Sequence, residues 1–244
     1  MSYEPTSRGN PQQLTVNQHF HSAHSIAKFC QNDKVQVYLH KEKKIESRKK
    51  DAKIFCAKRA WDERAEKLVM IHFEDRFHRT IDTAVPFSER DHKAITSYAV
   101  LWSLRFQYAQ SKSAVDPLIG ITGSSLSHAQ EEVLEKNFVS FVRADSFVPS
   151  RFENGFQIQR GIDMAMAEMG HIKWGLMIAK DSELLVSDNY VGLLYLPIAP
   201  RLAFLAGSSD GVLEKKQVVE LNQTSIAYSR HFYFARDLKQ CPVS

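Results

Sequence analysis

The segment from Leu184 to Gly207, LLVSDNYVGLLYLPIAPRLAFLAG, is the most apolar part of the chain and restricts the possible folds most strongly. It is too rich in Leu, Val, Tyr and Phe for strands with one face in water, and Pro197 and Pro200 interrupt it. We therefore expect it to supply strands from the middle of a sheet. Asp188 lies where one of these strands begins. A carboxylate at the edge of an apolar core either forms a turn or belongs to a functional site.

The last third of the chain continues as short strands. Strands are predicted over residues 172–179, 184–186, 191–196, 202–206 and 231–235, with a hairpin turn at 180–183 and a helix over 212–230.

The middle of the chain has the spacing of helices. Apolar residues recur every three or four positions over 61–82 and again over 89–110, which predicts two long helices. Two further helices are expected over about 125–143 and 156–168, and residues 111–123 are expected to form a loop.

The N-terminal part begins with a polar stretch and continues into a small β unit. Residues 1–15 are expected to be flexible, and residues 34–40 alternate as a half-buried strand that pairs with a second short strand. A short helix is predicted over 51–59. The whole predicts an α+β fold in a single domain over 16–244: a central helical segment packed on a mostly antiparallel sheet, which comes mainly from the C-terminal third plus a small N-terminal hairpin.

Composition narrows the class of protein. The sequence has no signal-peptide pattern and no run of about 18 apolar residues, so we expect a cytoplasmic protein without membrane contact. The three cysteines lack C-x-x-C spacing, which argues against disulfides and zinc knuckles. His19, His21 and His24 match no zinc pattern, and neither a metal nor a cofactor is predicted.

Positive charge gathers in one segment. Residues 34–59 contain ten Lys or Arg and three acidic residues, while the whole chain carries a net charge of +4. A basic patch is therefore predicted at Lys41, Lys43, Lys44, Arg48, Lys49 and Lys50. Such a patch attracts phosphate backbones or acidic protein surfaces, and the alternative is an ordinary solvated hairpin.

Three polar residues fall on apolar helix faces. Glu74 and Arg105 lie on the two long central helices, where a bidentate contact would satisfy both charges. This pair either fixes the register of the helices or lines a polar pocket. Asn222 shares a face of the last helix with Val219 and Ile226, where a buried amide could bind strand ends near Asp188.

Together these residues resemble a widespread family of uncharacterised microbial proteins, known only as a domain of unknown function. The shared features are Gln18-His19-Phe20, Glu74, Arg105, Trp174, Ser187-Asp188-Asn189, the run LLYLPIAPRLAFL, and Leu221-Asn222 leading to a strand at 231–234. The chain departs from the family pattern in two turns: His21-Ser22 follow Phe20 where a proline is usual, and Tyr190 replaces the proline after Ser-Asp-Asn.

The resemblance implies a shared polar cluster. One hypothesis is a hydrolase acting on nucleic acid or a nucleotide, with His19, Asp188 and Glu74 as catalytic residues and Gln18, Arg105, Asn189 and Asn222 as binding residues. The alternative is a non-enzymatic binding protein or mobile-element inhibitor that docks on a bacterial nucleic-acid-handling (defence-type) complex through its basic segment or loops.

Overall fold

The computed structural model describes residues 3–83, 85–110, 117–190 and 195–244, and these form an α+β fold as predicted. The helices are α1 (Ala23–Ala27), α2 (Ile71–Asp82), α3 (His92–Gln110), α4 (His128–Lys136), α5 (Ser150–Met169) and α6 (Lys215–Tyr228). The strands are β1 (Asn17–His19), β2 (Lys34–Leu39), β3 (Lys44–Lys49), β4 (Cys56–Lys58), β5 (Trp174–Ala179), β6 (Val186–Ser187), β7 (Tyr195–Ala199), β8 (Leu202–Ala206), β9 (Gly211–Leu213) and β10 (Phe232–Ala235).

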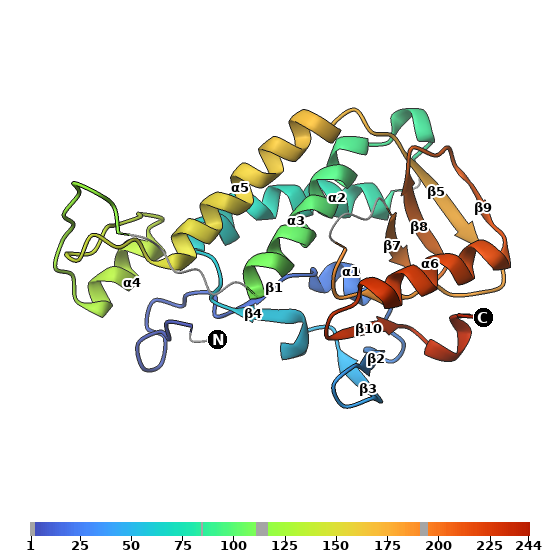
Figure 1. Cartoon of the computed structure of the whole chain (residues 1–244), viewed down its shortest axis with the longest axis horizontal. Coiled ribbons are helices and arrows are strands. Elements are labelled where there is room, and N and C mark those ends of the chain that lie inside the picture. Colours follow the sequence, from blue (N-terminus) through green and yellow to red (C-terminus); the bar gives the residue numbers. More distant parts are fainter. Residues whose placement is uncertain (1–2, 84, 111–116, 191–194) are drawn as a thin grey trace.

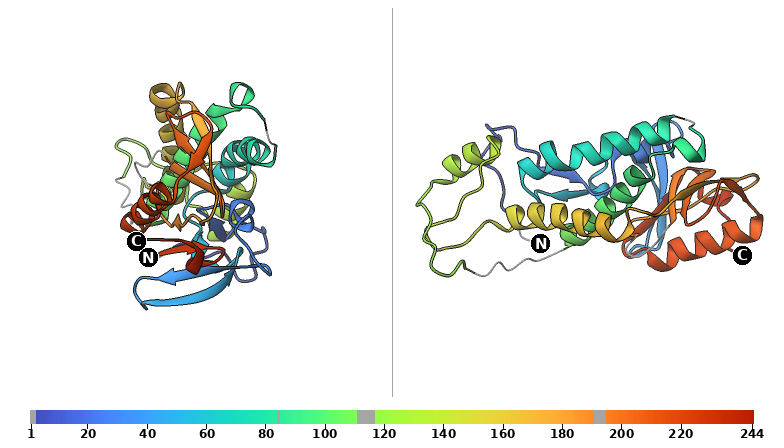
Figure 2. Two further views of the ribbon diagram at one scale, coloured as in Figure 1. Left: turned by 90° about the vertical axis from the view of Figure 1, so that its right-hand side faces the viewer. Right: turned by 90° about the horizontal axis from the view of Figure 1, so that it is seen from above.

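The molecule is elongated, with α2, α3 and α5 in its middle (Figure 1). Helix α3 packs against both α2 and α5, and 11 of its 19 residues are buried, which makes it the central helix. Helix α4 lies at one end of the long axis, and the sheet of β5, β7, β8 and β9 lies with α6 at the other (Figures 1 and 2).

The described strands form three sheets. One has the order β7-β8-β5-β9, and only its β5-β9 pairing is parallel. A second sheet, with the order β3-β2-β10-β6, is antiparallel throughout and joins the N-terminal hairpin to the end of the chain. A two-stranded ribbon pairs β1 with β4. The predicted combination of an N-terminal hairpin and C-terminal strands is therefore confirmed.

The apolar segment 184–207 is divided between two sheets. Strand β6 pairs with β10, whereas β7 and β8 pair with each other in the sheet that contains β5. The predicted hairpin turn at 180–183 is wrong, because β5 and β6 belong to different sheets. Of the described strands in this segment, only β8 is an interior strand; β6 and β7 are edge strands, although their side chains are mostly buried. Residues 191–194 of the predicted strand 191–196 lie outside the described residues, as do 111–116 of the predicted loop.

The helices predicted in the middle of the chain are present, but several of them begin or end at other residues than predicted. The first long helix comprises a π-helical stretch, Ala65–Met70, followed directly by α2. Ser127 caps α4 with a capping box, but α4 ends at Lys136, and α5 begins six residues earlier than expected. The predicted helix over 51–59 is wrong: a 3₁₀ turn at Lys53–Phe55 leads into β4.

The N-terminal segment, expected to be flexible, lies against the body of the protein. The backbone N–H of Ser7 donates to the buried carboxylate of Glu132 over 2.6 Å, and that of Thr15 donates to Glu63 over 2.9 Å. Leu14 is buried. Residues 3–15 therefore make specific contacts with α4 and with the start of the first long helix.

Candidate functional site

Asp188 binds backbone amides from the last loop before β10. Its Oδ1 accepts a hydrogen bond from the N–H of Arg230 at 2.8 Å, and its Oδ2 accepts from His231 at 2.6 Å and Phe232 at 3.1 Å. Burial raises the pKa of Asp188, and these three donors oppose that shift. Both carboxylate oxygens are thus engaged in holding the entry of β10.

Gln18 has a comparable role at β1. Its Oε1 accepts hydrogen bonds from the N–H groups of Ala60 and Trp61 at 2.6 and 3.1 Å, and its Nε2 donates to the carbonyl of Trp61 at 2.8 Å. The side chain is 1% exposed. Gln18 therefore fixes the turn that leads into the first long helix.

Asn222 joins α6 to two loops. Its Oδ1 accepts from the N–H of Leu185 at 2.8 Å, and its Nδ2 donates to the carbonyls of Glu183 and Pro242, each at 3.0 Å. These contacts match the expectation that a buried amide on this helix binds strand ends near Asp188.

Asn189 follows Asp188 and contacts neighbouring backbone. Its N–H donates to the Ser187 hydroxyl at 3.1 Å, and its Nδ2 donates to the carbonyl of Tyr228 at 3.4 Å. The Ser-Asp-Asn turn is thereby linked to the end of α6.

Glu74 and Arg105 form the predicted ion pair between α2 and α3. Their Oε1 and Nη1 atoms are 2.7 Å apart, and Glu66 lies 3.8 Å from Nη2 of the same guanidinium. The Arg105 side chain is 2% exposed and stacks over the Trp61 ring at 5.5 Å. Burial alone would lower the pKa of Arg105, but the charges of Glu74 and Glu66 raise it.

His19 lies on β1 opposite Cys56, and its Nε2 is buried without a hydrogen-bond partner among the described residues. The nearby His21 ring stacks on Trp102 with ring centroids 3.7 Å apart. Burial, followed by the charges of His19, His78 and Arg105, lowers the pKa of His21 well below its usual value. The His21 ring is therefore part of the packed core beside α3.

The predicted catalytic residues His19, Asp188 and Glu74 and the predicted binding residue Arg105 are only partly brought together. Glu74 and Arg105 touch, whereas Asp188 binds the backbone before β10, and no contact within the described part of the chain joins it to His19. Nor do three or more His, Cys, Asp or Glu side chains gather into a metal-binding group within the described ranges.

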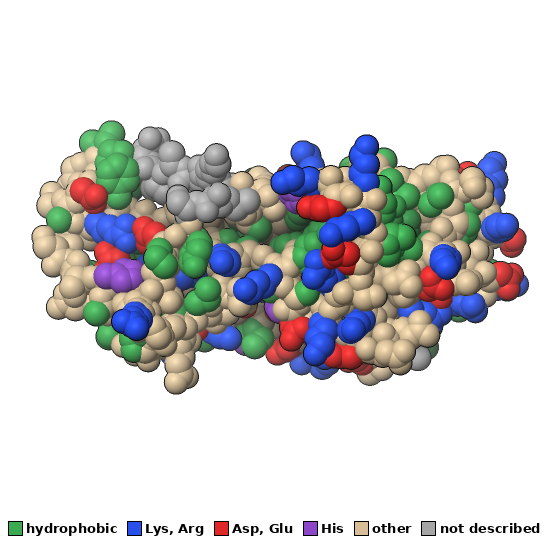
Figure 3. All heavy atoms as spheres, turned by 90° about the horizontal axis from the view of Figure 1, so that it is seen from below, with side chains coloured by type: hydrophobic (Ala, Val, Ile, Leu, Met, Phe, Trp, Pro, Cys, Tyr) green, Lys and Arg blue, Asp and Glu red, His purple; other side chains and the backbone are tan. Residues whose placement is uncertain are grey.

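The predicted basic patch lies on the hairpin of β2 and β3. All six of its cations are exposed, and β3 is an edge strand of its sheet. Lys44 and Arg48 both pair with Glu46, which leaves Lys41, Lys43, Lys49 and Lys50 as the more available charges. The hairpin projects from the body (Figure 2), and Lys and Arg side chains lie across this face with acidic groups among them (Figure 3).

Aromatic side chains beside this patch were not singled out from the sequence. The Tyr38 and Tyr233 rings stack at 5.0 Å with planes 16° apart, and His40 meets both rings edge-on at 5.6 and 5.5 Å. The alternation along β2 could have indicated Tyr38: because Val35, Val37 and Leu39 point into the core, Tyr38 points to the outer face of the sheet. Its partner on β10 comes from almost 200 residues later, which periodicity cannot reveal.

The site thus defines an α+β protein with a basic hairpin and a partly exposed aromatic pair. The chain matches no protein-family model, and comparisons with curated proteins and with solved structures gave no match either. Within the described residues, no helix combines the length and apolar composition needed to cross a bilayer.

Proposed function

We propose that this protein is a non-catalytic binding protein that holds single-stranded nucleic acid on the outer face and basic rim of the sheet β3-β2-β10-β6. The observation that carries the proposal is the stacked pair of Tyr38 and Tyr233 on a sheet whose projecting edge hairpin has six exposed cations. Aromatic faces next to a positively charged surface suit single strands, whose unpaired bases can stack and whose phosphates need counter-charge.

The aromatic pair supplies a stacking surface of the required kind. Tyr38 and Tyr233 lie opposite each other in the β2-β10 register and are both partly exposed. Stacking on an aromatic side chain contributes about 1–3 kcal/mol per base with little sequence preference. A sheet with these rings on its open face therefore favours unstructured DNA or RNA over duplex.

The hairpin supplies the charge. Residues 41–50 contain six Lys or Arg and two Glu, and Glu46 is already shared by Lys44 and Arg48. Four lysines thus remain for phosphate contacts. Each phosphate that a protein neutralises releases counterions, which makes the affinity fall as the salt concentration rises.

The engagement of the candidate catalytic groups favours binding over hydrolysis. A general base needs an oxygen or nitrogen within reach of substrate. Asp188 instead accepts three backbone hydrogen bonds, and Glu74 is paired with Arg105. The alternative function is docking of the basic hairpin on a nucleic-acid-handling protein complex. It would use the same lysines but would not require the tyrosines.

The test is fluorescence anisotropy with a labelled 15-nucleotide single strand and with the matching duplex over a series of salt concentrations. A variant with Lys41, Lys43, Lys49 and Lys50 changed to Gln is compared with a control of equal charge loss, in which exposed Lys67, Arg79, Lys93 and Lys173 become Gln. For the wild type, a plot of the logarithm of the association constant against the logarithm of the salt concentration should have a slope of about −3. This value follows from four neutralised phosphates, each of which contributes about −0.7 for a single strand.

We expect the hairpin variant to lose most of this slope and the control variant to keep it. Equal effects of the two variants would show that net charge, not the hairpin, governs binding. Tighter binding to the duplex, or capture of an acidic protein with no binding to either oligonucleotide, would overturn the proposal.

A further inference from the structure

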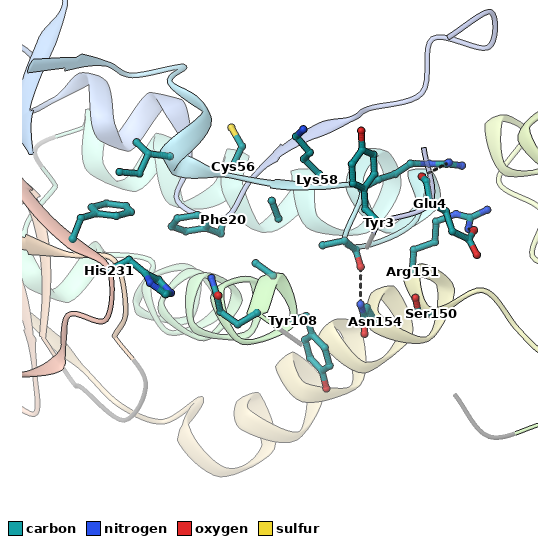
Figure 4. Close-up of a pocket in the computed structure, with 17 residues that line it drawn as sticks. Tyr3, Glu4, Phe20, Cys56, Lys58, Tyr108, Ser150, Arg151, Asn154 and His231 are labelled. Carbon is teal, nitrogen blue, oxygen red and sulfur yellow. Dashed lines mark hydrogen bonds and ion pairs between the residues drawn. The ribbon is translucent and has the colours of Figure 1, made fainter. Parts of the chain in front are cut away.

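A cavity of about 620 Å³ lies between the N-terminal segment, β4, the end of α3, the start of α5 and the beginning of β10. Phe20 and His231 lie at one end, and Tyr3, Glu4 and Arg151 lie at the other (Figure 4). This volume is within the range of small-molecule sites, which are commonly apolar with a few convergent polar groups. The cavity is separate from the tyrosine pair of the proposed nucleic-acid surface.

One end of the cavity is cationic. Lys58, Arg59 and Arg151 line it, and both arginines are almost fully buried. Arg59 and Arg151 share the carboxylate of Glu135, at 2.5 and 2.8 Å. The Nη2 of Arg151 is nevertheless buried without a hydrogen-bond partner among the described residues. Because this nitrogen has almost no accessible surface, a ligand would meet the guanidinium at Nη1, where Glu4 now contacts it.

The first turn of α5 adds to the positive potential. Ser150 and Arg151 begin this 20-residue helix and line the cavity, and Pro149 at the N-cap position provides no side-chain acceptor. The first backbone N–H groups of a helix carry partial positive charge and favour anions.

A carboxylate of the protein itself already occupies this end. Glu4 bridges two arginines. Its Oε1 and Oε2 accept hydrogen bonds from Arg143 at 2.8 and 3.0 Å, and Oε2 also accepts one from Nη1 of Arg151. Burial raises the pKa of Glu4, but the hydrogen bonds and charges of the two arginines outweigh that effect and lower it. The Glu4 side chain is 41% exposed, so it is held at the surface rather than locked in the core.

Without Glu4, the cluster lacks one negative charge. Among the described residues, Arg59, Arg143 and Arg151 would then pair with just the carboxylates of Glu131 and Glu135, with Lys58 nearby. An external oxyanion can satisfy the same guanidinium groups, because arginine binds carboxylate and phosphate in the same bidentate manner.

The other end of the cavity is largely apolar, with His231 as a polar side chain beside Phe20 (Figure 4). Phe20 and Phe232 pack there with ring centroids 6.3 Å apart, and Ile54 and Ala57 are further apolar residues of the cavity wall. We propose that this cavity binds a small organic anion, with its carboxylate or phosphate at Arg151 and Lys58 and a flat apolar body against Phe20 and Phe232, and that Glu4 is its built-in competitor.

The experiment is isothermal titration of the full chain with phenyl phosphate, benzoate and AMP, with inorganic phosphate as a probe that lacks the apolar body. Glu4→Gln removes the competing carboxylate, so we expect about two- to fivefold tighter binding, the range of a half-exposed ion pair. Lys58→Gln should weaken binding by a similar factor. Lys53→Gln, at another exposed lysine outside the cavity, is the matched control and should change nothing.

Thermal unfolding of each variant checks that the fold is retained. Binding of an aromatic anion that tightens in Glu4→Gln, weakens in Lys58→Gln and exceeds that of inorganic phosphate supports the site. The absence of saturable binding of any probe to both the wild type and Glu4→Gln overturns it. Equal affinities for inorganic phosphate and phenyl phosphate also contradict it, because the apolar end would then play no part.

Discussion

Oε1 of Glu74 lies 2.7 Å from Nη1 of Arg105, and this contact joins α2 to the central helix α3. The guanidinium is buried, whereas the carboxylate is 18% exposed. Arg105→Met should therefore destabilise the protein by about 2 kcal/mol, because it leaves Glu74 and Glu66 without their counter-charge in a partly desolvated place. Urea unfolding measures this loss.

Arg76 supplies the comparison for this prediction, because it pairs with Asp91 at the surface at 2.8 Å. Arg76→Met should cost less than about 0.5 kcal/mol, as exposed ion pairs do. If both variants lose the same stability, the Glu74–Arg105 contact does not differ from a surface pair.

Asp188 is predicted to be structural. Asp188→Asn replaces one acceptor oxygen by an amide that faces the N–H groups of residues 230–232, so we expect a loss of about 2 kcal/mol in the free energy of unfolding. Nucleic-acid binding of the folded variant should be unchanged. Asp181→Asn, at an exposed position before β6, is the control and should be neutral. A stable variant with altered binding would instead place Asp188 in the site.

The sequence anticipated those features that depend on local periodicity. The apolar stripes over 61–82 and 89–110 predicted two long helices, and the same stripes placed Glu74 and Arg105 where they meet. Alternation over 34–40 predicted β2 in the same way. These signals arise within about twenty residues, so no knowledge of the remaining chain is needed.

Features that depend on distant partners were missed. Strand β6 pairs with β10 rather than with β5, and nothing near residues 180–187 indicates that choice. Helix α5 begins early because buried Arg151 and Asn154 occupy its inner face, and both read as surface residues. The role of Asp188 likewise depends on amides more than 40 residues away.

Asp62 should make stability depend on pH. It is buried at the start of the first long helix, where its Oδ2 accepts from the N–H of Ala65, and burial raises its pKa to about 6. The folded state then retains a proton that the unfolded state loses near pH 4. Stability therefore falls as the pH rises from about 4 to 6 and stays at the lower level above that window.

Asp62→Asn removes this dependence and keeps an acceptor at the cap. The advantage of the variant over the wild type should grow by about 2 kcal/mol between pH 4.5 and pH 7.5, which is most of the roughly 3 kcal/mol that a shift of about two pKa units represents. Urea unfolding at the two pH values tests this, with exposed Asp163→Asn as the control. A variant less stable than the wild type at pH 7.5 would mean that the charge stabilises the helix start.

Gly155 and Gly161 lie on the same helix and should respond differently to alanine. A Cβ at Gly155 would lie 2.0 Å from Oδ1 of Asp62 and 2.8 Å from the Cβ of Ala65, so Gly155→Ala should cost about 1–3 kcal/mol. At Gly161 the nearest atom is the end of the Leu104 side chain, which can move, so helix propensity should offset most of the strain. Thermal unfolding compares the two; a neutral Gly155→Ala would contradict the close approach of α5 to Asp62.

Tyr38 distinguishes nucleic-acid binding from simple charge attraction. Its ring is partly exposed and stacks on Tyr233, so Tyr38→Ala should reduce the affinity for a single strand by roughly tenfold or more, as the loss of one base stack implies. Tyr38→Phe keeps the ring and should bind nearly as the wild type does. The salt dependence should be the same in both variants, because the lysines of the hairpin are untouched. If Tyr38→Ala binds the oligonucleotide as tightly as Tyr38→Phe, the sheet face is not a stacking surface, and the lysines act on a partner without exposed bases.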